Sequence, residues 1–354
     1  MKYDFKNEGT MMRKIFLLLI SISFEFPDSV FGQAAGQHVQ KKGMNSVITK
    51  DVGKQKANIA ISRKPNNSNV VWRWSGAKSF SEGLAAVKDK NGKWGFIDKT
   101  GKIILPCVWS DAKEFSEGLA PVVGDSNNKG YIDKSGKIII TARAFEKFDA
   151  FHEGLACVKI DGKYGFVDKT GKIVVPCVWS DAKEFSEGLA PVKNDNGKWG
   201  YVDKAGEVII PCIWNTDAWS FHEGYASVTH NGTPSFIDKT GNVVLKLYNY
   251  SYAGSFYDGL AWVEDMHFRH GFIDKKGNEV ISCQGQYWYR RFSQGLAAYR
   301  GTSEWGFLDT KGNIVISKLF SIKGVLTFNE GLAAIHDNNG MWYYIDKTGK
   351  IVIQ

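Results

Sequence analysis

The hydrophobic and polar positions of the chain repeat with a period of roughly 35 residues, from about residue 71 to the C-terminus. One half of each unit reads F-S-E-G-L-A-x-V, and the other half reads W-G-F-I-D-K-x-G-K-I-I. The first half begins at Phe80, Phe115, Phe151, Phe185, Phe221, Phe256, Phe292 and Phe328. The Asp of the second half recurs 35 to 37 residues apart, at Asp98, Asp133, Asp168, Asp203, Asp238, Asp274, Asp309 and Asp346. Two linked motifs that stay in register eight times indicate a tandem-repeat domain.

The pattern within one unit predicts strands joined by tight turns. Strict alternation over Trp94–Asp98 is typical of a strand, and Gly95 leaves room for a bulky group, for which we expect an aromatic ring of the neighbouring repeat. Asp98 can cap its own turn and Gly101 can adopt a positive φ, which together predict a hairpin. The continuous apolar run Lys102–Leu105 predicts a strand that is covered on both faces.

The repeats predict an all-β domain of about eight antiparallel meanders, arranged either as a closed propeller-like ring or as an open superhelical solenoid. The ends bear on this choice. Trp72–Phe80 matches the late part of a unit, and Gly349–Gln354 matches the strand that this part lacks. Complementary ends favour the closed ring, in which both would complete one blade. A repeat of about 35 residues is short for four strands, which keeps the open solenoid as the alternative.

One stretch of 17 residues, PCVWSDAKEFSEGLAPV, occurs twice without change, at Pro106–Val122 and at Pro176–Val192. The offset of 70 residues equals two repeats. Duplication of a two-repeat unit accounts for it most simply, and we expect the two segments to be structurally equivalent.

The N-terminal part differs in composition from the repeats. Arg13 and Lys14 precede the apolar run Ile15–Phe24, and small residues follow before residue 36, which is typical of a secretory signal peptide over residues 1–35. Ten apolar residues are too few to span a bilayer, so this run is not a transmembrane helix. The alternative to a signal peptide is an internal hydrophobic strand. We therefore expect export to the periplasm, cell surface or exterior. Residues 36–70 then form a basic polar linker, and residues 71–354 form the repeat domain.

The net charge of +8 changes this picture little once it is located. Residues 36–70 carry seven basic and one acidic side chain, so +6 of the charge lies in the linker. The repeat domain is close to neutral, and we expect no nucleic-acid partner for it. Once the leader has been removed, we expect no transmembrane segment in the mature chain.

The repeat resembles the bacterial WG-repeat family, named for the pair seen at Trp94-Gly95, Trp199-Gly200 and Trp305-Gly306. The resemblance covers residues from about 71 to 354. Some copies depart from the pattern: the Trp position holds Lys129, Tyr164, Pro234 or His270 in four of them, and Tyr343 replaces Gly in the last. The resemblance implies a tandem β-repeat fold and says little about biochemical activity.

No residue pattern predicts catalysis, a metal site or a cofactor. The repeated Asp and Glu recur by symmetry, whereas an active site needs different residues in different roles at one place. His152 and His222 share one repeat position that we expect to face solvent. The five cysteines are odd in number and are best interpreted as small buried hydrophobes: Cys107, Cys157, Cys177, Cys212 and Cys283.

Aromatic residues are the best candidates for ligand binding. Aromatics that recur in register are most often core, and the alternative is a series of equivalent platforms on which sugar rings stack. The candidate residues precede or occupy the S-E-G half of the unit: Trp74, Trp109, Trp179, Trp214 and Tyr250. The leading hypothesis is a non-enzymatic exported module that binds a protein or cell-envelope partner. The alternatives are a multivalent glycan-binding domain that uses these Trp residues and, third, an enzyme.

Overall fold

The computed structural model describes residues 74–125, 128–283, 288–301, 304–319 and 322–354. These residues belong to one unit of the chain, Gln55–Gln354. The predicted signal peptide (residues 1–35) and linker (residues 36–70) lie outside the described residues. Within the described ranges the secondary structure is β-strand with turns and contains no α-helix, as the repeat pattern predicts.

The strands form eight antiparallel sheets, seven with four strands and one with three. Sheets one and two are β1 (Gly76–Ala77), β2 (Leu84–Lys88), β3 (Trp94–Asp98), β4 (Ile103–Trp109), and β5 (Asp111–Ala112), β6 (Ala120–Val123), β7 (Lys129–Ile132), β8 (Ile138–Thr141). Sheets three and four are β9 (Lys147–His152), β10 (Leu155–Ile160), β11 (Lys163–Asp168), β12 (Ile173–Trp179), and β13 (Asp181–Ala182), β14 (Ala190–Lys193), β15 (Trp199–Val202), β16 (Val208–Trp214). Sheets five and six are β17 (Ala226–His230), β18 (Thr233–Ile237), β19 (Val243–Lys246), and β20 (Tyr250–Tyr257), β21 (Leu260–Asp265), β22 (His270–Ile273), β23 (Glu279–Ile281). Sheets seven and eight are β24 (Trp288–Tyr289), β25 (Leu296–Arg300), β26 (Trp305–Asp309), β27 (Ile314–Leu319), and β28 (Ile322–Val325), β29 (Leu332–Asp337), β30 (Trp342–Asp346), β31 (Ile351–Ile353).

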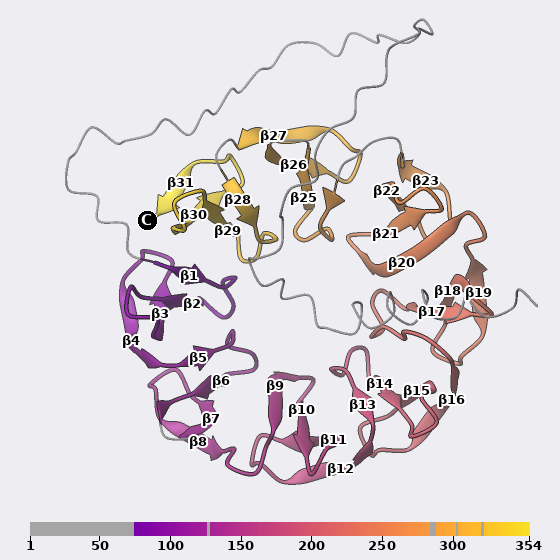
Figure 1. Cartoon of the computed structure of the whole chain (residues 1–354), viewed down its shortest axis with the longest axis horizontal. Coiled ribbons are helices and arrows are strands. Elements are labelled where there is room, and N and C mark those ends of the chain that lie inside the picture. Colours follow the sequence, from indigo (N-terminus) through magenta and orange to yellow (C-terminus); the bar gives the residue numbers. More distant parts are fainter. Residues whose placement is uncertain (1–73, 126–127, 284–287, 302–303, 320–321) are drawn as a thin grey trace, which may run out of the picture. The chain divides into compact units, whose positions relative to one another are not determined.

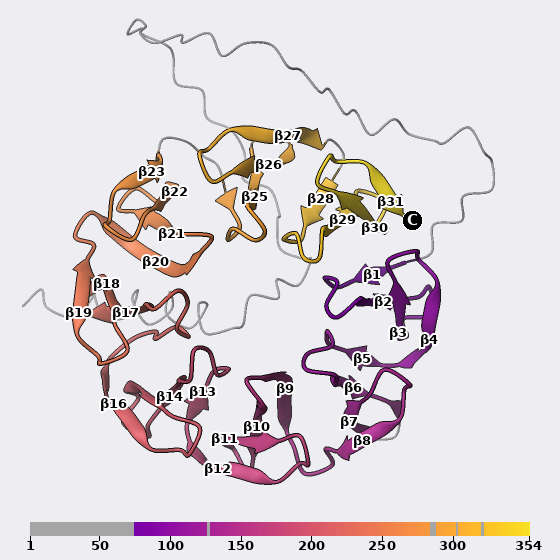
Figure 2. The same cartoon turned by 180° about the vertical axis from the view of Figure 1, so that it is seen from behind.

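The eight sheets are the blades of a closed ring, numbered one to eight in chain order (Figure 1). Figure 2 shows the same ring from behind, with the first strand of a blade toward the centre and the last strand at the periphery. The fold is therefore an eight-bladed β-propeller with one blade per repeat. The predicted closed ring is confirmed, and the open solenoid is not what forms.

Each D-K-x-G turn is built as the sequence predicts. The Asp98 Oδ1 atom accepts hydrogen bonds from the backbone N–H groups of Thr100 at 2.9 Å and Lys102 at 3.0 Å. Gly101 has a φ of 81°, which only glycine adopts without strain. The Thr100 hydroxyl also donates to Asp98 at 2.6 Å and lowers the pKa of that carboxyl below its ordinary value.

The glycine of the W-G pair is pressed by its own blade rather than by the neighbouring repeat. A Cβ on Gly95 would lie 2.7 Å from the Leu105 carbonyl oxygen and 2.8 Å from both the backbone N and the Sγ of Cys107. Leu105 and Cys107 belong to β4, whose pairing with β3 shifts register at this point. The predicted aromatic partner is therefore wrong here: an irregular fourth strand comes too close for any side chain.

The fourth strands are also more exposed than the sequence predicts. In β4, Ile103 is 47% and Ile104 is 40% exposed, so this apolar run is not covered on both faces. A continuous apolar run has the same pattern whether the strand is central or outermost. Here it is the outermost strand of a blade, with no neighbour on its outer side.

One aromatic pair joins every blade to the next. The Phe of F-S-E-G packs against the aromatic residue of the W-G-F-I strand in the preceding blade, with ring centroids 4.5 to 5.0 Å apart. The pairs are Phe96–Phe115, Tyr131–Phe151, Phe166–Phe185, Tyr201–Phe221, Phe236–Phe256, Phe272–Phe292, Phe307–Phe328 and Tyr344–Phe80. The last pair closes the ring with the same contact that holds the other seven junctions.

The two ends of the repeat domain meet at this closing junction. Trp74 forms an antiparallel bridge with Trp342 of β30, and the Trp342 N–H donates to the Trp74 carbonyl oxygen at 3.0 Å. Trp74 thereby takes the place beyond β31 where the outer strand of blade eight would continue. The prediction that both ends complete one blade is confirmed for Trp74, whereas β1, which follows it, belongs to blade one.

Candidate functional site

The connections within each blade divide the ring into two faces. The S-E-G turn joins the first strand to the second and the D-K-x-G turn joins the third to the fourth, so both turns lie at one end of the antiparallel strands. We call this side the clasp face. The hairpins between second and third strands lie at the other end. The Trp residues of the W-G pairs and those at the ends of the fourth strands lie at the same end, and we call that side the aromatic face.

On the clasp face, each S-E-G acid binds the next blade. The Glu117 Oε2 atom accepts from the Gly154 N–H at 2.9 Å and lies 3.0 Å from the Lys169 Nζ atom. The Gly N–H contact recurs at Glu82–Gly118, Glu153–Gly188, Glu187–Gly224, Glu223–Gly259, Asp258–Gly295, Gln294–Gly331 and Glu330–Gly83. The fold itself therefore uses the repeated acceptor oxygens at all eight junctions, which supports a structural role for this position.

On the aromatic face, the two Trp sets are cross-strand partners. Pairs of opposite residues are Trp94 and Trp109, Tyr164 and Trp179, Trp199 and Trp214, and Trp342 and Trp74. Tyr250 lies differently, in β20 opposite Asp265. The candidate ligand-binding residues Trp74, Trp109, Trp179, Trp214 and Tyr250 thus lie at five separate blade junctions and are not brought together into one site.

Burial separates these five residues into two groups. Trp74 is 2% and Trp214 is 3% exposed, so neither offers a ring face to a sugar. Trp109, Trp179 and Tyr250 are half-buried. Burial raises the pKa of Tyr250 to about 12, and Glu279, whose Oε2 atom lies 3.4 Å from the Tyr250 hydroxyl, adds to this shift.

Lysine side chains cover the third-strand aromatics. The Nζ atoms of Lys183 and Lys193 lie 5.2 and 5.7 Å from the Trp199 ring centroid. Lys183 also lies 3.9 Å from the Trp219 ring, and burial lowers the pKa of its ammonium group. Cations at this distance from a ring are attracted to its face. The protein itself therefore occupies the faces on which a ligand would stack.

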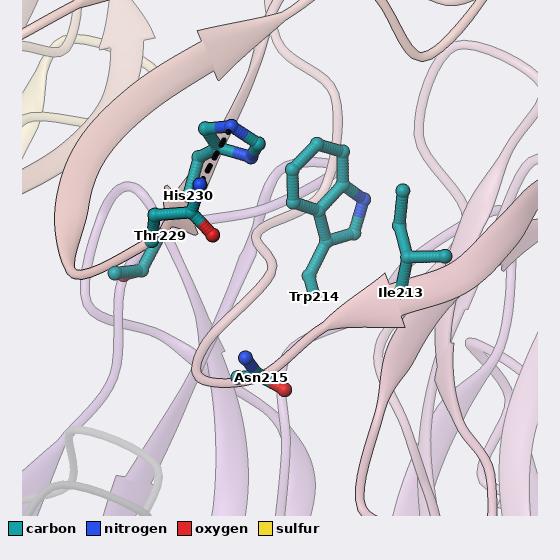
Figure 3. Close-up of a pocket in the computed structure, with 6 residues that line it drawn as sticks. Ile213, Trp214, Asn215, Thr229 and His230 are labelled. Atoms are coloured by element: carbon teal, nitrogen blue, oxygen red, sulfur yellow. Dashed lines mark hydrogen bonds between the residues drawn. The ribbon is translucent and has the colours of Figure 1, made fainter.

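A small hollow of about 150 Å³ opens beside Trp214 on the aromatic face (Figure 3). Its lining comes from the end of β16 and the β17–β18 hairpin: Ile213, Trp214, Asn215, Thr229, His230 and Asn231. The Trp214 and His230 rings meet edge to face, with centroids 5.6 Å apart. The indole Nε1 of Trp214 has no hydrogen-bond acceptor among the described residues. The two amides and the imidazole are groups that a sugar can contact, whereas the Trp214 ring itself is buried.

A belt of exposed β-branched side chains follows the outermost strands, and we call it the outer rim. It consists of Ile103, Ile104, Val108, Ile139, Ile173, Val174, Val178, Val208, Ile209, Ile213, Val244, Val280, Ile314, Val315 and Val352. Exposure is 50% at Val108, 56% at Val178 and 60% at Ile314. The sequence pattern does not predict this surface, because a continuous apolar run is equally typical of a strand that is covered on both faces.

Among the described residues, no group of three or more His, Cys, Asp or Glu side chains could hold a metal ion. His152 is exposed as predicted, but His222 is not solvent-facing: its Nε2 atom lies 3.0 Å from the Tyr257 hydroxyl of the next blade. Burial lowers the pKa of His222.

All five cysteines are free thiols; Cys157 and Cys283 are buried, as we expect of small hydrophobes, whereas Cys107, Cys177 and Cys212 are only half-buried. Cys107, Cys177 and Cys212 lie against the glycine of the W-G pair in their own blades. Burial raises the pKa of the Cys107 thiol, which disfavours the thiolate form.

The part of the chain that the structure describes holds no helix long and apolar enough to cross a bilayer.

Comparison with known proteins supports the fold. A family model described as WG containing repeat matches residues 73–94, 94–126, 130–164, 164–199, 199–233, 235–265, 271–300 and 305–342. The computationally designed Ika8 protein has a similar structure, with a TM-score of 0.54 at 12% identity over 77% of this chain and 96% of that one. A eukaryotic initiation factor has a TM-score of 0.53 at 10% identity over 78% and 86%. No curated protein matches the sequence. At such low identities the structural likeness concerns the fold alone.

Proposed function

Since the chain belongs to the WG containing repeat family and closes into a propeller, we propose that it is a non-enzymatic, exported binding module. In this proposal the ring is a rigid scaffold for a protein or cell-envelope partner. The repeated acids support a non-enzymatic role, because the fold uses them to cap turns and to join blades.

The outer rim is the observation that carries the proposal. Exposed apolar side chains that recur in order along neighbouring elements are typical of interaction surfaces. In β4 the outward positions Ile104, Pro106 and Val108 alternate along the strand, and all three are exposed. A proline in an outermost strand removes a backbone donor and discourages pairing with another strand. The rim therefore favours a partner that contacts side chains rather than one that extends the sheet.

The rim proposal predicts that charge at one exposed position prevents binding. A photo-crosslinking residue at Val178 should join the full-length protein to a partner in the producing cells, whereas one at Lys90 on the aromatic face should not. The crosslinked partner, once purified, should bind the native chain and lose at least about tenfold in affinity against Val178→Lys. Equal binding by both chains would contradict the rim proposal, provided that circular dichroism shows an unchanged fold.

A glycan-binding function is the second candidate, favoured by the hollow beside Trp214. A glycan array probed with the full-length protein tests it directly. Asn215→Ala and Asn231→Ala should each weaken the signal, because both side chains line the hollow, whereas Val178→Lys on the rim should leave it unchanged. No binding to any glycan, or binding that ignores both changes, would exclude this candidate.

Export rests on the leader-like residues 1–35. We propose that they are removed during secretion, leaving residues 36–70 as the linker to the ring. Mass spectrometry of the native protein should show a new N-terminus between about residues 32 and 36. An intact leader on protein recovered from the cytoplasm would contradict export.

A further inference from the structure

The hollow beside Trp214 lies where the connector into blade five is one residue longer than its equivalents. From the Trp that ends a fourth strand to the Phe of F-S-E-G, the chain advances six positions over Trp109–Phe115 and Trp179–Phe185, but seven over Trp214–Phe221. The extra residue falls in Asn215–Asp217, where the other two connectors have only Ser-Asp. The hollow is therefore found where the repeat departs from its usual length.

The shorter connectors close this place with a serine. The backbone N–H of Ser110 donates to the Val123 carbonyl oxygen at 2.7 Å, and that of Ser180 donates to the Lys193 carbonyl oxygen at 2.9 Å. Each serine hydroxyl donates to the same carbonyl oxygen, at 2.8 and 3.0 Å. The first strand of each blade, β5 or β13, then pairs with the second strand directly after the serine.

Thr216 holds the serine position in the longer connector and makes neither bond. Among the described residues its backbone N–H has no such carbonyl partner, and its hydroxyl oxygen is buried without a hydrogen bond. Pairing begins only at Ala218, whose single bridge to Val228 leaves sheet five with three strands. The inserted residue thus opens the edge of blade five, and the hollow of about 150 Å³ lies beside this opening.

The polar groups around the hollow are mostly donors. The Lys198 ammonium group donates to the Asn215 side-chain oxygen, so the amide nitrogen of Asn215 is left to donate elsewhere. Asn231 adds a second amide, whose nitrogen lies 3.4 Å from the Nε2 atom of His230, at the wall of the hollow (Figure 3). None of the six lining residues is acidic. A cation and several donors without a carboxylate favour a ligand that brings an anion.

The hollow also has an apolar side and room for a ring. Ile213, which is 56% exposed, lines it together with Thr229. A space of about this volume holds a six-membered ring. Ile213 can contact the face of such a ring, whereas the amides and the Thr229 hydroxyl can bind its hydroxyl groups. This combination suits a sugar that carries a carboxylate better than a peptide carboxylate, which brings no ring hydroxyls.

We propose that the hollow between blades four and five binds one acidic sugar unit of a polysaccharide, a hexuronic acid, with its carboxylate toward Lys198 and Asn215. The proposal rests on the glycan-binding candidate and narrows its ligand class from any glycan to an anionic one. It does not depend on a partner at the outer rim.

Pairs of oligosaccharides that differ only in charge test the proposal on the full-length protein. They are oligomers of galacturonic, glucuronic and mannuronic acid, each with its methyl ester. Titration calorimetry should show that at least one acid binds and that its ester binds at least about tenfold more weakly. The affinity for the acid should fall as NaCl is raised, because salt screens a partly exposed ion contact.

Two variants test the place of binding. Deletion of Asn215 together with Thr216→Ser gives blade five the connector of blades two and four. This variant should lose binding of the acid, and its melting temperature should stay the same or rise, because the serine bonds are restored. Lys198→Gln should weaken binding of the acid by about tenfold and leave binding of the ester unchanged. Lys93→Gln is its matched control and should bind like the native chain, since Lys93 holds the same repeat position but pairs with Asp125.

Four results would overturn the proposal. Esters that bind as tightly as the acids would refute the acidic ligand and leave the glycan-binding candidate standing. Failure of every acid to bind would do the same if the array shows a neutral glycan, and would remove the candidate as well if it shows none. Equal binding by the native chain, Lys198→Gln and the shortened connector would mean that the sugar binds elsewhere. Equally strong competition by a polyglutamate peptide would assign the hollow to protein carboxylates instead.

Discussion

At the scale of single residues, the S-E-G acid is the clearest case of backbone strain offset by a contact. All eight residues at this position have φ between 49° and 56°, although none of them is glycine or asparagine. The left-handed conformation costs such a residue about 1–2 kcal/mol. The acceptor oxygen that reaches the next blade's Gly N–H offsets this cost, and Gln294 shows that an uncharged acceptor makes the same contact, at 2.9 Å.

Two replacements of Glu117 should therefore distinguish the contribution of its hydrogen bond from that of its ion pair. Glu117→Ala leaves the left-handed strain without its hydrogen bond and should lower the free energy of unfolding by about 1–2 kcal/mol. Glu117→Gln should lose much less, because it keeps the acceptor and gives up only a partly exposed ion pair. Urea unfolding followed by circular dichroism measures both. If the two variants were equally unstable, the ion pair with Lys169 rather than the hydrogen bond would hold the junction.

Acid should weaken the ring through the same carboxyl groups. Thr100 and its equivalents lower the pKa of the turn Asp residues below 3.8, as at Asp98, Asp133 and Asp168. At Glu117, burial alone would raise the pKa, but Lys169 and the Gly154 N–H bring it below 4.5. A lowered folded pKa contributes stability above the ordinary value, and that stability is lost as pH falls through the folded pKa. We expect the urea midpoint to be flat from pH 7 to 5 and to fall below about pH 4.5; equal midpoints at pH 7 and 3 would contradict this.

At the scale of the strand and the turn, the glycine of the W-G pair is needed because the fourth strand of its blade lies too close for a Cβ atom. Its own φ does not require glycine. The third strand can stay regular only if the irregular fourth strand passes directly over it. Gly165 and Gly200 show the same contact with Cys177 and Cys212, so the Trp-Gly pair and the Pro-Cys pair of the next strand form one unit of packing.

Gly95→Ala should consequently be severe. Its Cβ would lie 2.7 Å from a backbone oxygen that cannot move without breaking the sheet, and we expect a loss of about 3 kcal/mol or more in unfolding free energy. Gly92→Ala is the matched control. It adds a Cβ in open space, 3.8 Å from the nearest atom of Lys88, and should cost only about 1 kcal/mol for its positive φ. Adding Cys107→Ala should not rescue Gly95→Ala, because the backbone contacts remain; full rescue would show that only the thiol matters.

The sequence predicts the elements that depend on local chemistry and misjudges those that depend on position in the ring. Turns such as Asp98–Gly101 follow from residue preferences within four positions, so they are confirmed. The apolar run of β4 gives no sign of its outermost place, so its exposure is not predicted. Trp109 and Trp214 occupy one repeat position, yet Trp214 is buried against His230 where Trp109 lies over Gly124.

At the scale of the whole molecule, closure of the ring gives every blade a neighbouring blade on both sides. The junction between blades eight and one has the aromatic pair Phe80–Tyr344 and the acceptor contact Glu330–Gly83 that the other junctions have. The Tyr344 hydroxyl adds a bond to the Lys78 carbonyl oxygen at 2.7 Å. No end of the array is left to be capped, in contrast to an open solenoid.

Deletion of Gly349–Gln354 should therefore act on the whole ring. It removes β31, with buried Ile353, and leaves Trp74 without the strand that it continues. The edge of β30 that β31 covers becomes exposed, which favours aggregation. We expect the loss of the single cooperative unfolding transition and larger species in size-exclusion chromatography with light scattering. Val352→Ser, on the exposed side of the same strand, should change neither; a soluble deletion variant with only slightly reduced stability would argue that closure contributes little.

The duplicated 17-residue segment allows the chain to fold out of register. Pro106–Val122 and Pro176–Val192 both run from the outer strand of one blade through the first strand of the next into its second. A chain that has not yet finished folding can therefore place either copy in the same local contacts, two blades out of step, because the contacts within the 17 residues are the same. Such a slipped ring omits two blades and traps the chain. Synthesis from the N-terminus limits this error, because the first copy finds its neighbours before the second has been made.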